Sequence, residues 1–104
     1  MLDYSREAVA MAKDKTRAEL DADRKLNLSL VRLLEVVGEA ASQVPRVDRA
    51  QYPAIPWPDI VGLRNRLIHA YEKVDLKIVW EIVTQDLPPL IAELEKILEK
   101  EPGA

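Results

Sequence analysis

The segment from Arg24 to Val44 constrains the fold most, because it contains no proline and carries apolar side chains around most of a helical circumference. A single neighbouring helix cannot cover so wide a surface, so this helix is expected at the centre of a bundle or against a second subunit. Gly38 interrupts the segment at a cost of about 1 kcal/mol relative to alanine, which predicts a close approach by another helix. The apolar positions are Leu26, Leu28, Leu30, Val31, Leu33, Leu34, Val36, Val37, Ala40 and Ala41.

Three other segments show helical patterns. Residues 2–18 form a moderately amphipathic helix, and Asp21 and Asp23 offer N-caps for the helix that follows. Pro45 ends the second helix, and the connector to Pro58 is expected to be extended apart from one short turn around residues 48–51. The third helix is predicted over residues 58–71.

The fourth helix is predicted from an N-cap at Asp75 to about residue 100, with a kink or a break at Pro88-Pro89. The pattern as a whole predicts an all-α fold, an antiparallel four-helix up-and-down bundle in one domain that spans residues 1–104.

Composition limits the function. The chain has 104 residues, one histidine and no cysteine, which excludes disulfides and argues against a zinc site within one chain. A net charge of −3 argues against a protein that simply coats nucleic acid, whereas a local basic cleft remains compatible with it. No signal peptide and no apolar run of membrane-spanning length is present. We therefore expect a cytoplasmic protein with no membrane partner and no cofactor.

The chemistry is concentrated between Arg64 and Tyr71, which enclose the only histidine, His69. An imidazole moves protons near neutral pH, and a guanidinium holds phosphate oxygens through its fork of donors. Together they supply what metal-free cleavage of a phosphodiester needs. On an ideal helix, however, Arg64 and His69 point about 140° apart. They converge on one phosphate only if the helix loosens near His69 or a second subunit completes the site.

Each of these residues also has an ordinary structural interpretation. A lone histidine near a helix end is commonly a surface or capping residue, and Arg64 and Arg66 can lie over the core and pair with carboxylates. Tyr71 continues the apolar stripe of Ile60, Leu63 and Leu67, so it can belong to the core. Asn65 is then an exposed helix residue, and Glu39 a solvated one.

The pattern Arg64-Asn65 … His69-Ala70-Tyr71 resembles the R-x4-H-x-Y motif of the HEPN superfamily, in particular the HepT-type toxin ribonucleases. The resemblance covers about residues 2–98. It includes Val37-Gly38-Glu39-Ala40, the run from Ile55 to Asn65, Val74-Asp75, Val79-Trp80 and Asp86-Leu87-Pro88. Val37 and Leu63 replace an isoleucine and a methionine of the family pattern, and both changes conserve volume.

The resemblance implies a metal-independent endoribonuclease toxin of a type VII-like toxin–antitoxin pair. It implies that Arg64 and His69 are the catalytic pair at a homodimer interface, with RNA as the substrate, and that Asn65 orients the site. The cognate partner is an MNT-type nucleotidyltransferase antitoxin, which adds AMP to Tyr71 and so occludes the site. Glu39 is a weaker candidate for orienting an arginine or the histidine in the dimer.

Two alternatives belong to other functional classes. The chain can be a non-catalytic helical module that docks on a nucleotidyltransferase and helps to hold nucleotide. It can also be a structural bundle without a site, although that reading leaves the clustering of Arg64, Asn65, His69 and Tyr71 unexplained. Cleavage of RNA in the absence of metal separates the first hypothesis from both alternatives.

Overall fold

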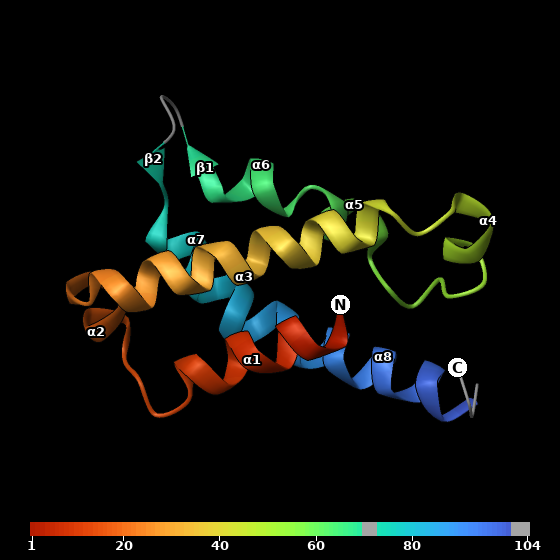
Figure 1. Cartoon of the computed structure of the whole chain (residues 1–104), viewed down its shortest axis with the longest axis horizontal. Coiled ribbons are helices and arrows are strands. Elements are labelled where there is room, and N and C mark those ends of the chain that lie inside the picture. The colour runs from red at the N-terminus through yellow and green to blue at the C-terminus, as the bar shows by residue number, and fades with distance from the viewer. Residues whose placement is uncertain (70–72, 101–104) are drawn as a thin grey trace.

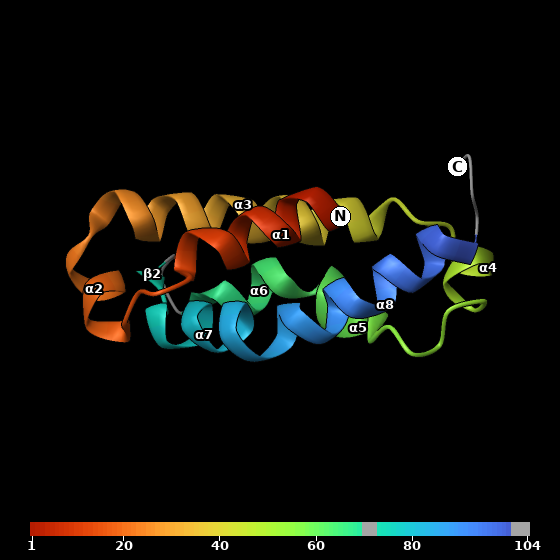
Figure 2. The ribbon, with the colours of Figure 1, turned by 90° about the horizontal axis from the view of Figure 1, so that it is seen from below.

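Helix α3 (Arg24–Ser42) is the central element of the chain. In the computed structural model, which describes residues 1–69 and 73–100, α3 packs against α1, α2, α5, α6 and α7. Figure 1 shows it between α1 on one side and α5–α6 on the other, and Figure 2 shows two layers, α1 with α3 above and α5 to α8 below. The central position predicted from its wide apolar surface is confirmed.

The class is all-α, as predicted, and the successive long segments run in alternate directions. One two-residue antiparallel ladder joins Ile68–His69 (β1) to Lys73–Val74 (β2). The remaining elements are α1 (Leu2–Ala12), α2 (Arg17–Ala22), α4 (Arg46–Arg49), α5 (Trp57–Val61), α6 (Leu63–Leu67), α7 (Leu76–Glu81), the π-helical turn η1 (Ile82–Asp86) and α8 (Leu87–Lys100).

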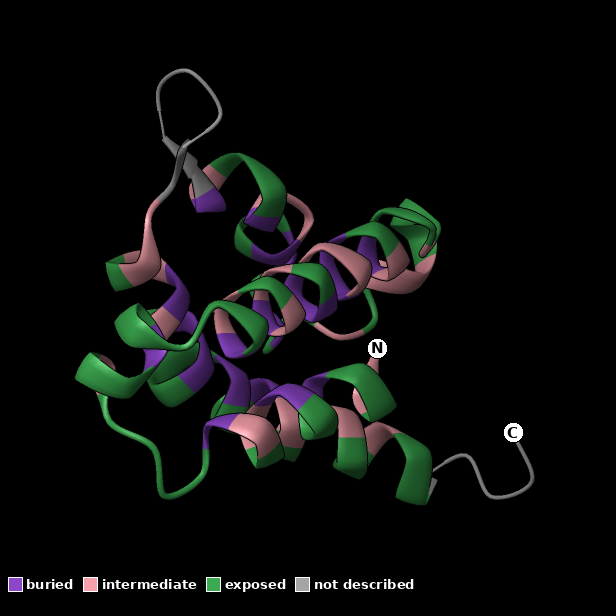
Figure 3. Cartoon of the chain, turned by 60° about the vertical axis from the view of Figure 1, so that its left-hand side comes forward, coloured by how far each residue is buried: buried purple, intermediate pink, exposed green. Residues whose placement is uncertain are grey.

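The core lies between the two layers, where the buried residues of Figure 3 face one another. It consists almost wholly of Leu, Ile, Val and Ala, as the absence of phenylalanine requires. The fully buried large side chains are Leu20, Leu30, Leu34, Leu63, Leu67, Ile82, Leu87, Val37, Val79 and Val83. Leu63 and Leu67 belong to α6, so the core holds the segment that leads to His69.

The first helix is shorter than predicted. It ends at Ala12, and Asp14 then adopts a left-handed conformation with φ 63°. Aspartate tolerates that conformation better than most residues, so the chain turns here. A separate helix, α2, begins after Thr16, whose Oγ1 accepts a hydrogen bond from the Glu19 amide at 3.1 Å. Asp23 caps α3 as expected, with its Oδ1 3.0 Å from the Leu26 amide nitrogen.

The third helix is also shorter than the predicted span of residues 58–71. It divides at Gly62 into α5 and α6, and α6 ends at Leu67. The Leu67 carbonyl accepts a hydrogen bond from the Asp75 amide at 3.0 Å, so it is not available to continue the helix. The ladder therefore replaces the last predicted turn, and Tyr71 lies outside the described residues.

The fourth helix begins at the predicted cap, where Asp75 Oδ1 accepts from the Lys77 amide at 3.0 Å. The irregularity expected at Pro88-Pro89 is a π-helical turn, η1, in which the Leu87 N–H donates to the Ile82 carbonyl. A proline cannot donate to the carbonyl four residues earlier, and its ring collides with that carbonyl. The carbonyls four residues before Pro88 and Pro89 are those of Thr84 and Gln85, and both lie in η1. Helix α8 therefore continues through the two prolines.

Gly38 is the point where α3 and α5–α6 touch. A Cβ atom there would lie 3.1 Å from the Ile60 carbonyl oxygen and 3.4 Å from the Leu63 Cβ. The close approach predicted from the glycine is therefore confirmed. It brings the backbone that precedes Arg64 directly against the central helix.

Replacement of Gly38 by alanine is expected to lower the free energy of unfolding by up to about 2 kcal/mol. Overpacking costs roughly 1–3 kcal/mol, and the better helix propensity of alanine returns only about 1 kcal/mol of it. Urea unfolding at fixed protein concentration measures the effect. Lys25→Ala, an exposed change on the same helix, is the control and should leave the midpoint nearly unchanged. Equal stability of Gly38→Ala and the parent would show that the two helices separate at little cost.

Candidate functional site

Buried side chains fix α5 and α6, the two short helices that precede His69, on the core. Trp57 and Ile60 anchor α5, and Leu63 and Leu67 anchor α6 on α3. The Trp57 indole Nε1 also donates a hydrogen bond to the Tyr52 carbonyl at 3.1 Å, which fixes the proline-rich connector against the start of α5. The buried side of α6 is therefore fixed on α3, and its opposite side faces solvent.

Arg64 and Asn65 occupy that exposed side. Among the side chains that the structure describes, those of residues 1–67 and 75–99, neither has a hydrogen-bond or ion-pair partner. A guanidinium without a carboxylate partner keeps its full charge and all its donors for an anion. The arrangement leaves Arg64 free to bind a phosphate group.

Arg66 differs from Arg64, although the two are separated by one residue. Its Nη2 lies 3.0 Å from Oδ2 of Asp86 in η1, and the two side chains are 38% and 48% exposed. The structural interpretation, in which an arginine pairs with a carboxylate, therefore describes Arg66, whereas no described carboxylate pairs with Arg64. An ion pair this exposed stabilises the fold by no more than about 1 kcal/mol.

His69 is placed by the ladder rather than by a helix. Its backbone pairs with Lys73, and Ile68 pairs with Val74. Because α6 ends at Leu67, the divergence of about 140° expected between Arg64 and His69 on a continuous helix does not apply. The backbone thus shows a loosening of the helix near His69, one of the two conditions under which Arg64 and His69 could reach the same phosphate.

Glu39 lies on the exposed side of α3, not inside its apolar surface. Its Oε1 accepts a hydrogen bond from Gln43 Nε2 at 3.2 Å. The structure shows no hydrogen bond or ion pair between the described side chains of Glu39 and Arg64. The expected role of Glu39, orienting an arginine or the histidine in a dimer, therefore stays a prediction.

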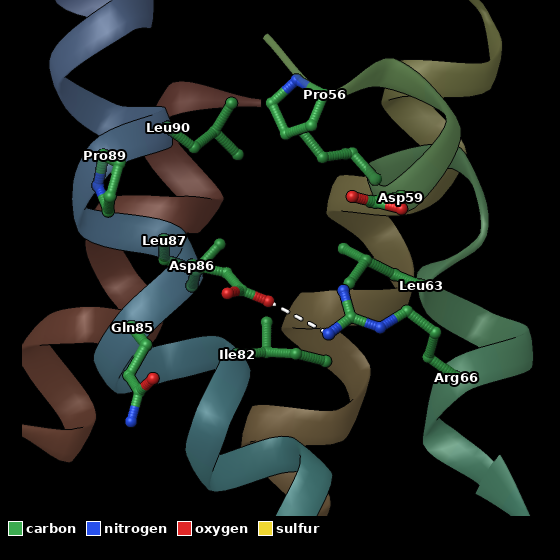
Figure 4. A pocket seen from close by; sticks show the side chains of 11 residues that line it. Pro56, Asp59, Leu63, Arg66, Ile82, Gln85, Asp86, Leu87, Pro89 and Leu90 are labelled. Atoms are coloured by element: carbon green, nitrogen blue, oxygen red, sulfur yellow. Dashed lines mark hydrogen bonds and ion pairs between the residues drawn. The ribbon is translucent and has the colours of Figure 1, made fainter.

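A pocket that the sequence did not indicate lies on the other side of α6, between α5–α6 and η1–α8 (Figure 4). Its volume is about 440 Å³. We call it the α6–α8 groove. Its polar lining residues are Asp59, Arg66, Gln85 and Asp86, and its apolar walls include Leu63 and Leu90. No local sequence signal joins Arg66 to Asp86, because the two residues are brought together only by the packing of α6 on η1.

Two further observations concern the described part of the chain. It contains no group of three or more His, Asp or Glu side chains arranged to hold a metal ion. None of its helices is both long enough and apolar enough to cross a bilayer.

Comparison with known proteins gives consistent results. A family model described as "Ribonuclease HepT-like" matches residues 1–97. A protein of Methanocaldococcus jannaschii named as an RNase, MJ0125, is 34% identical over 99 residues, which are 95% of this chain and 85% of that protein. A Thermococcus cleftensis protein named as ribonuclease HepT is 34% identical over 95 residues, 88% of this chain and 86% of its own length.

A Caldanaerobacter subterraneus protein named as an RNase, TTE0752, is 38% identical over 79 residues, which are 76% of this chain and 70% of that protein. No solved structure matches the chain.

Proposed function

Because the chain belongs to the HepT-like ribonuclease family, we propose that it is an endoribonuclease toxin whose reacting groups are Arg64 and His69. One observation carries the assignment of these residues. Arg64 is exposed on a short helix that ends two residues before His69, and none of the carboxylates that the structure describes pairs with it. Of the alternatives, a structural bundle does not explain the similarity to proteins named as ribonucleases.

The proposed reaction needs no metal. The 2′-hydroxyl of the RNA attacks the adjacent phosphorus while a general base takes its proton. The bond from phosphorus to the 5′-oxygen then breaks, and a general acid protonates that oxygen. The products are a 2′,3′-cyclic phosphate and a free 5′-hydroxyl. Arg64 stabilises the charge that develops on the phosphoryl oxygens, and Asn65 orients the site.

A homodimer supplies the second proton-transfer group. Each chain has one histidine, whereas the reaction calls for a base and an acid. Two copies of the motif that face each other across an interface give one histidine for each role. Helix α3 supports this arrangement, because Leu28 is 53% exposed and Val31, Val36 and Ala40 are only partly buried. Glu39 lies on the same part of α3, so a dimer can bring it to the site even though a single chain does not.

Cleavage in EDTA tests this proposal directly. The purified protein is incubated with end-labelled RNA, and the new ends are tested for cyclic phosphate. We expect cleavage with cyclic phosphate ends. Tight nucleotide binding with no cleavage at stoichiometric protein would instead support the docking module, a non-catalytic partner of a nucleotidyltransferase.

The second part of the proposal concerns regulation. We expect that a cognate MNT-type nucleotidyltransferase, the antitoxin, transfers AMP to the hydroxyl of Tyr71. The added phosphate and nucleoside would lie two residues from His69, where they occupy space and repel the phosphate of an incoming RNA.

Mass spectrometry after co-expression with the nucleotidyltransferase measures this modification. We expect a peptide containing Tyr71 to gain one AMP group and the modified protein to lose cleavage. Tyr71→Phe is the control, because it removes only the acceptor hydroxyl. It should stay unmodified and active beside the nucleotidyltransferase. Silencing of Tyr71→Phe to the same extent as the parent would refute regulation through this residue.

A further inference from the structure

The α6–α8 groove has the size and the walls of a ligand site. Its volume of about 440 Å³ falls within the range of roughly 300–1,000 Å³ that small-molecule pockets occupy. In Figure 4, Pro56 and Leu63 border it on the α5–α6 side, and Ile82 and Leu90 border it on the η1–α8 side. A flat ring can enter between two apolar walls of this kind, as unstacked bases do in proteins that bind single-stranded RNA.

The charges of the groove exclude a phosphate and favour hydrogen-bond donors. The guanidinium of Arg66 is already paired with Asp86 at 3.0 Å. The carboxylate of Asp59 points toward the groove from α5, and no described residue forms a hydrogen bond or ion pair with it. One positive and two negative groups leave the groove with a negative charge. A neutral ligand edge that donates hydrogen bonds fits this environment, whereas an anionic group does not.

The free carboxylate discriminates among the four RNA bases. A carboxylate has two oxygens that only accept, so its best partner presents two donors side by side. Guanine does so through N1–H and the N2 amino group. Adenine and cytosine present an amino group next to a ring nitrogen that accepts, and uracil presents one N–H between two carbonyls. Asp59 therefore favours guanine.

We propose that the α6–α8 groove binds a guanine base of the RNA strand, with Asp59 as the residue that determines specificity. The inference rests on the proposed ribonuclease activity. It adds that cleavage occurs near a guanine that is held at a fixed distance from the reacting phosphate. Helix α6 links the two sites, since it carries both Arg64, the proposed phosphate-binding residue, and Arg66, which lines the groove. The guanidinium plane of Arg66 offers a surface on which the base can stack.

The substitution Asp59→Asn tests the assignment without removing the groove. An amide presents one acceptor beside one donor, which matches adenine or cytosine better than guanine. Sequencing of the ends that the full-length protein produces from a random RNA pool should show a preferred guanine near the cut. In Asp59→Asn this preference should fall by roughly tenfold and move toward adenine or cytosine. Asp3→Asn is the matched control, because Asp3 is also an exposed aspartate in the first turn of a helix.

A titration with nucleosides tests the groove separately from cleavage. Amide chemical shifts of the isotope-labelled protein are followed as guanosine, inosine, adenosine or uridine is added. Guanosine should give saturable shifts at Asp59 and Arg66 at the lowest concentration. Inosine, which lacks the N2 amino group, should need a higher concentration, and uridine the highest. Asp59→Asn should weaken binding of guanosine and Asp3→Asn should not.

The outcomes separate this inference from the proposed function. RNA cleavage without a guanine preference, or with the same preference in Asp59→Asn, would overturn the groove assignment and leave the ribonuclease proposal intact. Guanosine binding without RNA cleavage would support the groove and overturn the ribonuclease. A protein that neither cleaves RNA nor binds guanosine would overturn the groove assignment and the ribonuclease proposal alike. Retention of the preference in Asp3→Asn, together with its loss in Asp59→Asn, would establish the carboxylate as the discriminating group.

Discussion

Replacement of His69 by alanine is expected to lower the rate of RNA cleavage by about 10²–10⁴-fold, the range over which a positioned acid or base contributes. The loss follows because no other side chain of the chain is an imidazole. Single-turnover cleavage in EDTA at saturating protein measures the chemical step, and circular dichroism shows whether the fold is retained. Glu39→Gln is the comparison, and its effect should be much smaller because its carboxylate already has Gln43 as a local partner.

A mixing experiment extends this prediction to the dimer. If both histidines of a dimer are required, excess His69→Ala chain should silence the parent as mixed dimers form. The parent alone should show a bell-shaped dependence of rate on pH, because one imidazole must be neutral and the other protonated. Activity that stays proportional to the amount of parent chain, whatever the excess of variant, would show that each chain acts with its own histidine.

Replacement of Arg64 by alanine has the second largest expected effect, a fall in cleavage rate of about 10²–10³-fold. Its loss removes charge from the reacting phosphate and breaks no hydrogen bond or ion pair with a described side chain. Arg64→Lys should recover only part of the rate, since an ammonium lacks the planar fork of donors. Unfolding in urea should show equal stability for the parent and both variants.

Arg46→Ala provides the matched control. Arg46 is also an exposed arginine, and it lies on α4, away from α6. Its removal changes the net charge by the same amount but should leave the cleavage rate within about twofold of the parent, because surface charges far from a site act only weakly at ordinary salt. A rate that falls equally in Arg46→Ala and Arg64→Ala would show that the arginines act through general attraction of RNA and not at the reacting phosphate.

The helix ends show how far local sequence can be interpreted. Asp23 and Asp75 were predicted as caps, and each accepts the expected backbone hydrogen bonds. The break after Ala12 was missed, although Thr16-Arg17-Ala18-Glu19 has the pattern of a capping box, which starts a helix. That signal was present in the sequence and would have placed α2.

The end of the third helix was a different kind of error. The apolar stripe of Ile60, Leu63 and Leu67 continues to Tyr71, so periodicity alone extends the helix through His69. What ends it is the hydrogen bond from the Asp75 amide to the Leu67 carbonyl, which depends on a chain reversal. A local pattern does not contain that information, because the competing donor comes from the next segment.

The sequence left two places for α3, the centre of a bundle or a contact with a second subunit. It was sufficient to predict the helical class, the close approach at Gly38 and the family that the motif from Arg64 to Tyr71 resembles. These features depend on periodicity, on caps and on spacing, which are local. The tertiary structure was needed to show that Arg66 binds Asp86 while no described side chain pairs with Arg64, and that α6 and η1 enclose a groove beside Asp59. Such features arise where segments far apart in the chain meet, and their contacts depend on how the core packs.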